Sequence, residues 1–194
     1  MDPHSYFAPF GIDIDFDTGE MRAPDSVVTR RASDMRSYYR DEEDLDRIVT
    51  TLGDPVHYEV LESNIPEEYG HLRVVISRLQ PGRIGDEFFM TKGHYHTVSA
   101  TAEVYLCLRG EGVMLMKTSE GHAREERMAP QRLVYVPPHW AHRSVNTGAE
   151  PLISLCVYPG EAGHNYGDIV DQGFPQRVIY KNGEVVIERV QPED

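Results

Sequence analysis

Short hydrophobic runs separated by Gly- and Pro-containing breaks fill the middle of the chain. Seven runs have the length and the β-branched or aromatic content of strands, at residues 56–61, 72–79, 87–90, 104–108, 113–117, 133–136 and 152–158. Turn residues separate several of them, as in Gln80-Pro81-Gly82 and Ser119-Glu120-Gly121. Because few connections are long enough for crossover helices, the pattern predicts an all-β sandwich or barrel.

Both ends of the chain have different patterns. Residues 11–17 alternate apolar and polar side chains, which predicts an edge strand or an arm. Residues 41–52 combine an acidic first turn with apolar positions at helical spacing, and Gly53 follows, so we expect a short helix that ends there. Residues 177–187 predict a hairpin that turns at Asn182-Gly183.

The length of 194 residues favours a single domain. We expect an N-terminal arm and helix in residues 1–55, the barrel core in residues 56–159, and a loop and a C-terminal hairpin in residues 160–194.

The net charge of the chain disfavours some classes of binding partner. Acidic residues outnumber basic ones by 32 to 19, which gives a formal net charge of −13. Such a field repels phosphate backbones and anionic membranes, so we expect neither nucleic acid nor a membrane as a partner. An anionic substrate would have to be held by local donors.

The two cysteines, Cys107 and Cys156, each lie in an apolar run and are interpreted as reduced core residues. No apolar stretch approaches the roughly 20 residues of a membrane span, and the N-terminus lacks the features of a signal peptide. These features predict a cytoplasmic protein.

A possible metal site begins at residues 91–103. In an extended chain, His94 and His96 point to the same side, and a hairpin at residues 97–102 would bring Glu103 beside them. Two imidazoles and a carboxylate suit Fe(II), Mn, Ni or Zn, and the absence of nearby thiolates argues against a structural zinc site. The alternative to a metal site is a pair of histidines that lie on the surface or form hydrogen bonds. A fourth ligand should come from residues 134–146, which contain His139 and His142 after a double proline.

These residues together resemble the two motifs of the cupins, in the order His94, His96, Glu103, Gly110, Pro137, His142 and Asn146. The resemblance implies a double-stranded β-helix, or jelly-roll, barrel whose metal is held by the two histidines and the glutamate of the first motif and the histidine of the second. Two features depart from the general cupin pattern. Six residues separate His96 from Glu103, and Gln131 and His139 stand where glycines are common.

The residues in and around the motifs resemble those of one branch of the cupins, the archaeal cupin-type glucose-6-phosphate isomerases. In that branch the wide His-to-Glu spacing is normal. The similarity covers nearly the whole chain, with segments at residues 9–16, 33–35, 54–60, 87–96, 102–105, 134–143 and 158–167.

The resemblance implies roles for named residues. The metal ligands would be His94, His96, Glu103 and His142, because the spacing to Asn146 favours His142 over His139, and Fe(II) would be the native metal, with Mn, Ni or Zn as alternatives. Substrate would be bound by Ser77, Thr91, Lys92, Gly93, Tyr105, Tyr158 and Tyr166. Tyr158 could equally be a core aromatic at a strand end. The resemblance also implies a homodimer.

The implied reaction is metal-dependent interconversion of glucose 6-phosphate and fructose 6-phosphate by hydrogen transfer between C1 and C2. Glu103 would be the base, and His164 would serve ring opening or the hydroxyl protons. Exchange of the C2 hydrogen with solvent would indicate an enediol route, and complete retention a direct hydride shift. Two other functions stay open at this point, a metal-dependent dioxygenase and a non-catalytic sugar-binding cupin.

Overall fold

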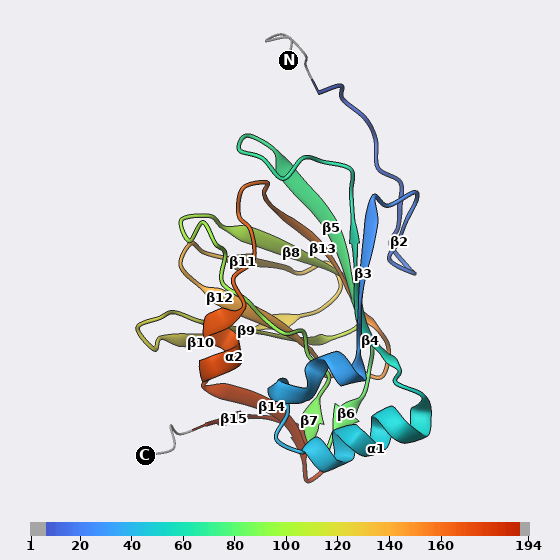
Figure 1. Ribbon diagram of the computed structural model, residues 1–194, viewed down its shortest axis with the longest axis vertical. Helices are drawn as coiled ribbons and strands as arrows, with labels where there is room; N and C mark the ends of the chain where they lie inside the picture. Colours follow the sequence, from blue (N-terminus) through green and yellow to red (C-terminus); the bar gives the residue numbers. More distant parts are fainter. Residues whose placement is uncertain (1–6, 191–194) are drawn as a thin grey trace.

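The protein folds as an all-β barrel with a few short helices, as the sequence predicts (Figure 1). The computed structural model describes residues 7–190. Its elements are, in chain order, β1 (Ile14–Asp15), β2 (Glu20–Met21), β3 (Ser26–Arg31), the 3-10 helix η1 (Ala32–Tyr38), α1 (Glu42–Leu52), β4 (Val56–Glu62), β5 (Leu72–Leu79), β6 (Arg83–Ile84), β7 (Glu87–Phe88), β8 (Glu103–Arg109), β9 (Gly112–Lys117), β10 (Ala123–Met128), β11 (Leu133–Val136), β12 (Ala141–Asn146), β13 (Leu152–Pro159), α2 (Gly167–Gln172), β14 (Gln176–Lys181) and β15 (Glu184–Arg189).

Two antiparallel sheets form the jelly-roll barrel. One has the strand order β11-β8-β13-β5-β4-β3, and the other has the order β10-β9-β12. Four of the seven neighbouring pairs in these orders join strands that are not consecutive in the chain, as in a rolled double sheet rather than a simple meander. The chain between β7 and β8 joins the second sheet through isolated bridges to β12. A smaller sheet, β15-β14-β7-β6, lies with η1 and α1 at one end of the barrel (Figure 1).

Several elements were not predicted, among them β3, β10 and α2. β3 is the edge strand of the larger sheet and pairs with β4, although its sequence ends in two arginines. β10 carries four consecutive charged residues and is largely exposed, so only its backbone pairing with β9 makes it a strand. α2 has six residues, too few to show a helical period.

The predicted helix is confirmed as α1. The side chain of Asp41 accepts a hydrogen bond from the N–H of Asp44, and Gly53 ends the helix in the left-handed conformation at φ +70°. Leu45 and Ile48 are buried on one face. The predicted C-terminal hairpin is also confirmed, with both Asn182 and Gly183 at positive φ, as the tight turn requires.

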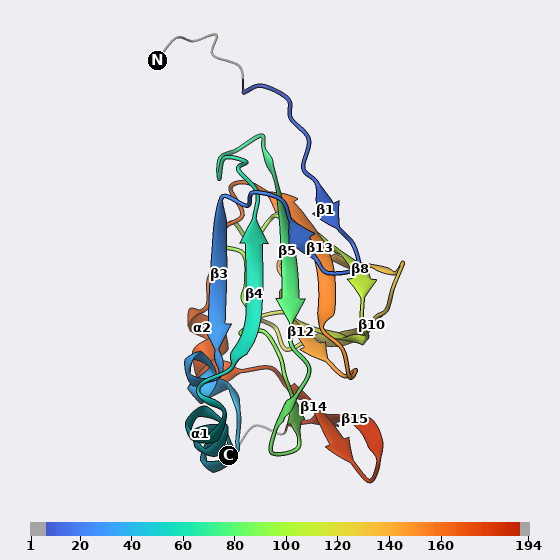
Figure 2. The same ribbon diagram turned by 90° about the vertical axis from the view of Figure 1, so that its right-hand side faces the viewer.

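The N-terminal arm forms less regular structure than its alternation predicts. Within residues 11–17, only Ile14–Asp15 pairs, with β2. The arm lies across the outer face of the larger sheet (Figure 2), where Met21 packs on Ile76 and Ile153. Ile12 and Ile14 also pack there, whereas Phe16 is exposed.

Both cysteines are buried free thiols, which confirms their prediction as reduced core residues. Across residues 7–190, none of the helices combines the length and the apolar character that a membrane crossing would need.

The turn between β8 and β9 should be sensitive to a single methyl group. Gly110 has φ +80°, and a Cβ there would lie 2.5 Å from the carbonyl oxygen of Pro151. We expect Gly110→Ala to lower the free energy of unfolding by about 3 kcal/mol, from the left-handed backbone and the added clash. Urea denaturation measures this.

Gly121→Ala is the matched control, because Gly121 has φ +87° and open space around its Cβ position. We expect it to cost about 1 kcal/mol, from the backbone conformation alone. Equal losses in the two variants would contradict the prediction.

Candidate functional site

A backbone bridge brings two distant histidines together. His94 and His142 pair in antiparallel fashion, the N–H of each donating to the carbonyl of the other at 3.2 and 3.1 Å. Their rings consequently lie side by side, with centroids 4.5 Å apart. Because β12 is fixed by its pairing with β9, this bridge also fixes the segment that carries His94.

Glu103 lies beside the histidines, as the predicted hairpin requires. Its Oε2 is 3.1 Å from Nε2 of His96 and 3.0 Å from Nε2 of His142. We call His94, His96, Glu103 and His142 the His/Glu cluster. One ligand atom from each of the four lies within 4.8 Å of the others, and all but the half-buried His94 are buried.

Thr101, which the sequence analysis missed, determines which nitrogen of His96 carries the proton. The Thr101 hydroxyl donates to the carbonyl of Val98 at 2.6 Å, so at 2.8 Å from Nδ1 of His96 it acts as the acceptor. Nδ1 therefore carries the hydrogen, and Nε2 presents its lone pair to the centre of the cluster. The signal in the sequence was a hydroxyl residue two positions before the glutamate.

The cluster fits a divalent cation. Nε2 of His94 and Nδ1 of His142 are buried without a hydrogen-bond partner within residues 7–190, whereas Nε2 of His142 lies 3.0 Å from Oε2 of Glu103. Lone pairs and a carboxylate that converge in this way repel each other unless a positive charge lies among them. Imidazole and carboxylate donors suit Fe, Mn, Ni or Zn.

His139, the other candidate for the fourth ligand, points elsewhere. Its side chain is exposed, and its N–H donates to the carbonyl of Ser99 at 2.7 Å. His139 has φ +70° and Gln131 has φ +68°, so both hold the backbone conformation that glycine adopts readily. Gln131 and His139 therefore differ from the usual glycines in residue type, but both have the positive φ that glycine adopts readily.

A cavity of about 280 Å³ opens beside the cluster, between the two sheets. Alternate residues of the larger sheet face into it, because side chains of a strand point to opposite sides in turn. Examples are Glu103 and Tyr105 in β8, and Cys156 and Tyr158 in β13.

All the predicted catalytic and substrate-binding residues line this cavity. They are Ser77, Thr91, Lys92, Gly93, Glu103, Tyr105, Tyr158, His164 and Tyr166. Tyr158 is buried, so it is both a core aromatic and part of the wall. Sequence reasoning missed Arg30, Tyr58, Glu62 and Ser144, which also line it. Arg30 could have been found only with β3, which was not predicted.

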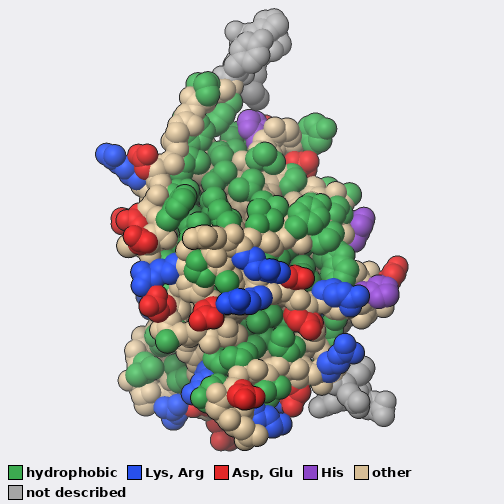
Figure 3. All heavy atoms as spheres, turned by 180° about the vertical axis from the view of Figure 1, so that it is seen from behind, with side chains coloured by type: hydrophobic (Ala, Val, Ile, Leu, Met, Phe, Trp, Pro, Cys, Tyr) green, Lys and Arg blue, Asp and Glu red, His purple; other side chains and the backbone are tan. Residues whose placement is uncertain are grey.

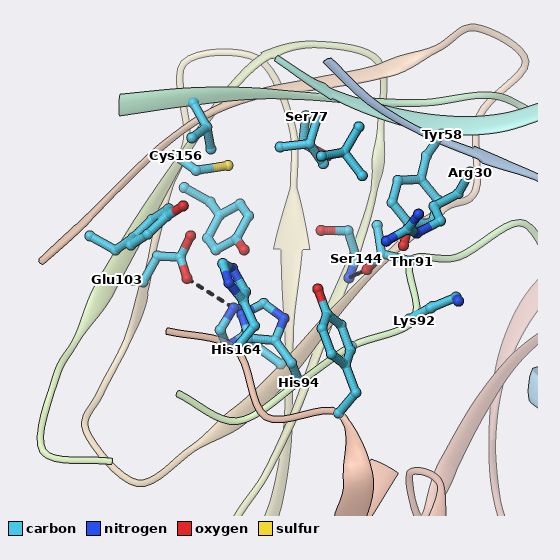
Figure 4. A pocket seen from close by; sticks show the side chains of 18 of the residues that line it. Arg30, Tyr58, Ser77, Thr91, Lys92, His94, Glu103, Ser144, Cys156 and His164 are labelled. Carbon is cyan, nitrogen blue, oxygen red and sulfur yellow. Dashed lines mark hydrogen bonds and ion pairs between the residues drawn. The ribbon is translucent and has the colours of Figure 1, made fainter. Parts of the chain in front are cut away.

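The cavity has two chemically different ends (Figure 4). Glu103 and His164 lie at one end, whereas Arg30, Tyr58 and Thr91 gather at the other. The Thr91 hydroxyl accepts a hydrogen bond from the N–H of Ser144 at 3.1 Å, which leaves its own hydrogen free to donate into the cavity.

Two cations lie at the end opposite the cluster. Burial, then the positive charge of Arg30, lowers the pKa of the Lys92 amine. The phenol of Tyr58, whose pKa burial raises to about 12, keeps its proton and can donate. This end is therefore suited to an anion, although the protein as a whole is acidic.

The chain is similar to proteins of known activity. Residues 29–193 match the family model described as glucose-6-phosphate isomerase. The glucose-6-phosphate isomerase of Thermococcus litoralis is 49% identical, over 94% of this chain and 95% of the relative. That of Pyrococcus furiosus is 47% identical over the same shares. Among solved structures, the oxalate decarboxylase of Lactobacillus farciminis has a TM-score of 0.45 and 21% identity, over 56% of this chain and 30% of that one.

Removing the hydroxyl that orients His96 should weaken metal binding. We expect Thr101→Val to lower the affinity for a divalent metal about 10-fold, because Nδ1 of His96 loses its closer acceptor at 2.8 Å and keeps only the Thr101 carbonyl at 3.3 Å. Titration of metal-free protein with Mn(II) or Zn(II) in a calorimeter measures this.

Thr101→Ser keeps the hydroxyl and should retain most of the affinity. If the valine and serine variants bound metal equally well, the assigned role of Thr101 would be wrong.

Proposed function

The chain belongs to the glucose-6-phosphate isomerase family and interconverts glucose 6-phosphate and fructose 6-phosphate, and we propose that it does so with one divalent metal ion held by the His/Glu cluster. The metal proposed is Fe(II), with Mn(II), Ni(II) and Zn(II) as substitutes that the same nitrogen and oxygen donors accept. The proposed catalytic unit is the whole chain as one domain.

The two-ended cavity is the observation that carries the assignment of roles. A sugar phosphate has an anion at C6 and its reacting carbonyl and hydroxyl at C1 and C2. With the phosphate near Arg30 and Thr91, C1 and C2 fall toward Glu103 and His164 (Figure 4). The same orientation serves both directions of the reaction, because aldose and ketose differ only at C1 and C2.

The phosphate would be held by Arg30, Lys92, the Thr91 hydroxyl and the backbone at Gly93. Gly93 has φ +75°, and a Cβ there would lie 2.8 Å from the ring of Phe174. A glycine thus lets the segment pack closely on Phe174, on the side away from the lining of the cavity, while Gly93 itself lines the cavity. Ser77, Tyr105, Tyr158 and Tyr166 would hold sugar hydroxyls.

Glu103 is the proposed base. It would take the hydrogen at C2 of the open-chain aldose as a proton and return it to C1, while a proton passes from O2 to O1. When bound, the metal ion would act as a Lewis acid that stabilises the negative charge developing on the substrate oxygens. The Tyr105 hydroxyl interacts with Glu103, and burial raises the pKa of this phenol, so Tyr105 remains a donor that steadies the carboxylate.

His164 is proposed for the protons of ring opening and of the hydroxyl groups. Its ring lies 4.5 Å from that of His94 and is stacked on Tyr166 at 6.0 Å, at the exposed edge of the cavity. A side chain open to solvent on one side and to the sugar on the other can exchange protons with water.

A dioxygenase activity is a less well supported function for the same set of metal ligands. Such sites usually face apolar or aromatic substrates, whereas this cavity presents two cations and several hydroxyls. A non-catalytic sugar-binding role is disfavoured because the ligand set is complete.

We also propose a homodimer formed through the outer face of the larger sheet. Two cross-strand rows of apolar side chains cover β11, β8 and β13 there, Leu133-Leu106-Leu155 and Tyr135-Val104-Val157, and we call them the apolar ladder. None of the six is fully buried, and Leu133 and Tyr135 are more than half exposed. Seen from behind, hydrophobic side chains gather in the upper half of the molecule (Figure 3). A second copy presents the same ladder, so the pair can close by a two-fold axis.

Metal removal tests the proposed function. With fructose 6-phosphate as substrate and glucose 6-phosphate detected by its dehydrogenase, we expect EDTA to abolish turnover and Fe(II), Mn(II), Ni(II) or Zn(II) to restore it. His142→Ala should lose at least about 100-fold in kcat/KM, because it removes a ligand and an oriented partner of Glu103.

His139→Asn is the matched control, since it changes an exposed histidine and keeps a residue that tolerates positive φ. We expect it to retain full activity. Turnover that survives exhaustive chelation would contradict the metal proposal, and no turnover with any metal would contradict the isomerase.

Charges placed in the apolar ladder should separate the dimer. We expect the double variant Leu133→Glu/Tyr135→Glu to have the mass of one chain by light scattering, whereas Val185→Glu, an exposed position on β15, leaves the mass of two chains. A wild-type protein that is monomeric at micromolar concentration would rule the dimer out.

A further inference from the structure

Arg143, the residue after the metal-site histidine His142, is a buried cation that the proposed chemistry does not use. Its side chain is 5% exposed, and it does not line the substrate cavity. Burying a guanidinium costs free energy unless its N–H groups are satisfied, so its contacts must do something that an apolar residue could not.

The contacts of Arg143 are chiefly with neutral groups. Nη2 and Nε both donate to the carbonyl of Lys92, at 2.6 and 3.3 Å, and Nη1 lies 3.3 Å from Sδ of Met90. The guanidinium carbon lies 4.6 Å from the ring of Phe174 and 5.6 Å from that of Tyr38. The two rings and the carbonyl hold the group by cation–π and charge-assisted contacts.

A nearby carboxylate, Glu87, has other partners. Its oxygens are bonded to the guanidinium of Arg177 and to the N–H of Arg40. The positive charge of Arg143 is therefore directed mainly at the Lys92 carbonyl.

That carbonyl lies in the middle of the segment at the phosphate end, residues 91–93, all three of which line the cavity. The segment is packed tightly against Arg143, because a Cβ on Gly93 would lie 3.1 Å from Cβ of Arg143. The ring of Tyr38 lies near both residues. It is 5.6 Å from Nζ of Lys92 and 5.6 Å from the guanidinium carbon of Arg143.

We propose that Arg143 is a positioning residue that fixes the 91–93 segment through the Lys92 carbonyl and thereby sets the affinity for the substrate phosphate. Tyr38 from η1 and Phe174 from the chain after α2 support it from two sides. The inference rests on the proposed function, because it assigns the phosphate to this end of the cavity. Arg143 does not touch the substrate and acts only through residues 91–93.

The test compares Arg143→Met and Arg143→Lys with the wild type in the fructose 6-phosphate assay, with inorganic phosphate as a competitive inhibitor. We expect Arg143→Met to raise KM and the phosphate Ki together by about 10-fold or more and to change kcat by less than about 3-fold, since donors at one end of the substrate are displaced. Arg143→Lys keeps the charge but not the paired donors, so it should recover only part of the loss.

Arg177→Lys is the matched control. Arg177 is another arginine near Glu87, but it lies on β14 and bonds to Glu87 rather than to residues 91–93. We expect its KM and Ki to equal those of the wild type. Bound metal per chain, measured by elemental analysis, should be unchanged in all three variants.

A second pair of variants keeps the test decisive if the Arg143 variants do not fold. Tyr38→Leu removes an aromatic face and should raise KM and the phosphate Ki, whereas Tyr38→Phe keeps that face and should not. An Arg143→Met enzyme with KM and Ki within about 2-fold of wild type, or with a loss confined to kcat, would overturn the inference. A wild-type protein without turnover would instead remove the proposed function.

Discussion

The reciprocal bridge between His94 and His142 is the contact on which the site depends. It attaches an irregular segment to β12, whose position is already fixed by β9, and so places two histidines of the His/Glu cluster against each other. Gly93 must precede the bridge, because a Cβ there would meet the His142 carbonyl oxygen at 3.0 Å. The same bridge therefore determines where residues 91–93 enter the substrate cavity.

The His/Glu cluster is a locally unfavourable arrangement that the barrel imposes. Within the described residues, Nε2 of His94 and Nδ1 of His142 are buried without hydrogen bonds, and a carboxylate lies between the Nε2 atoms of His96 and His142. An apolar replacement would satisfy the fold better, so the arrangement has to be explained by what it binds. Thr101 supports this interpretation, since it fixes the tautomer of His96 that a metal ligand needs.

Much of the fold and of the site could be predicted from the sequence, for identifiable reasons. Strands with clear hydrophobic runs, the capped helix α1 and the Asn182-Gly183 hairpin each carry a local signal. β10 and α2 carry none, because one is polar and the other too short. Motif spacing and family resemblance placed the predicted residues at one cavity. Arg30 and Arg143 were not predicted. The proposed role of Arg30 depends on the pairing of β3 with β4, and that of Arg143 depends on aromatic rings distant in the chain.

The acidity of the protein bears on how the proposed phosphate end of the cavity is built. A net charge of −13 opposes the approach of a sugar phosphate, so long-range steering cannot supply the affinity. Affinity has to come from short-range donors inside the cavity, where water is scarce and each contact is screened less by salt. Such donors are effective only if their positions are fixed. A buried guanidinium that holds the Lys92 carbonyl between two aromatic rings meets that requirement without placing another charge against the substrate.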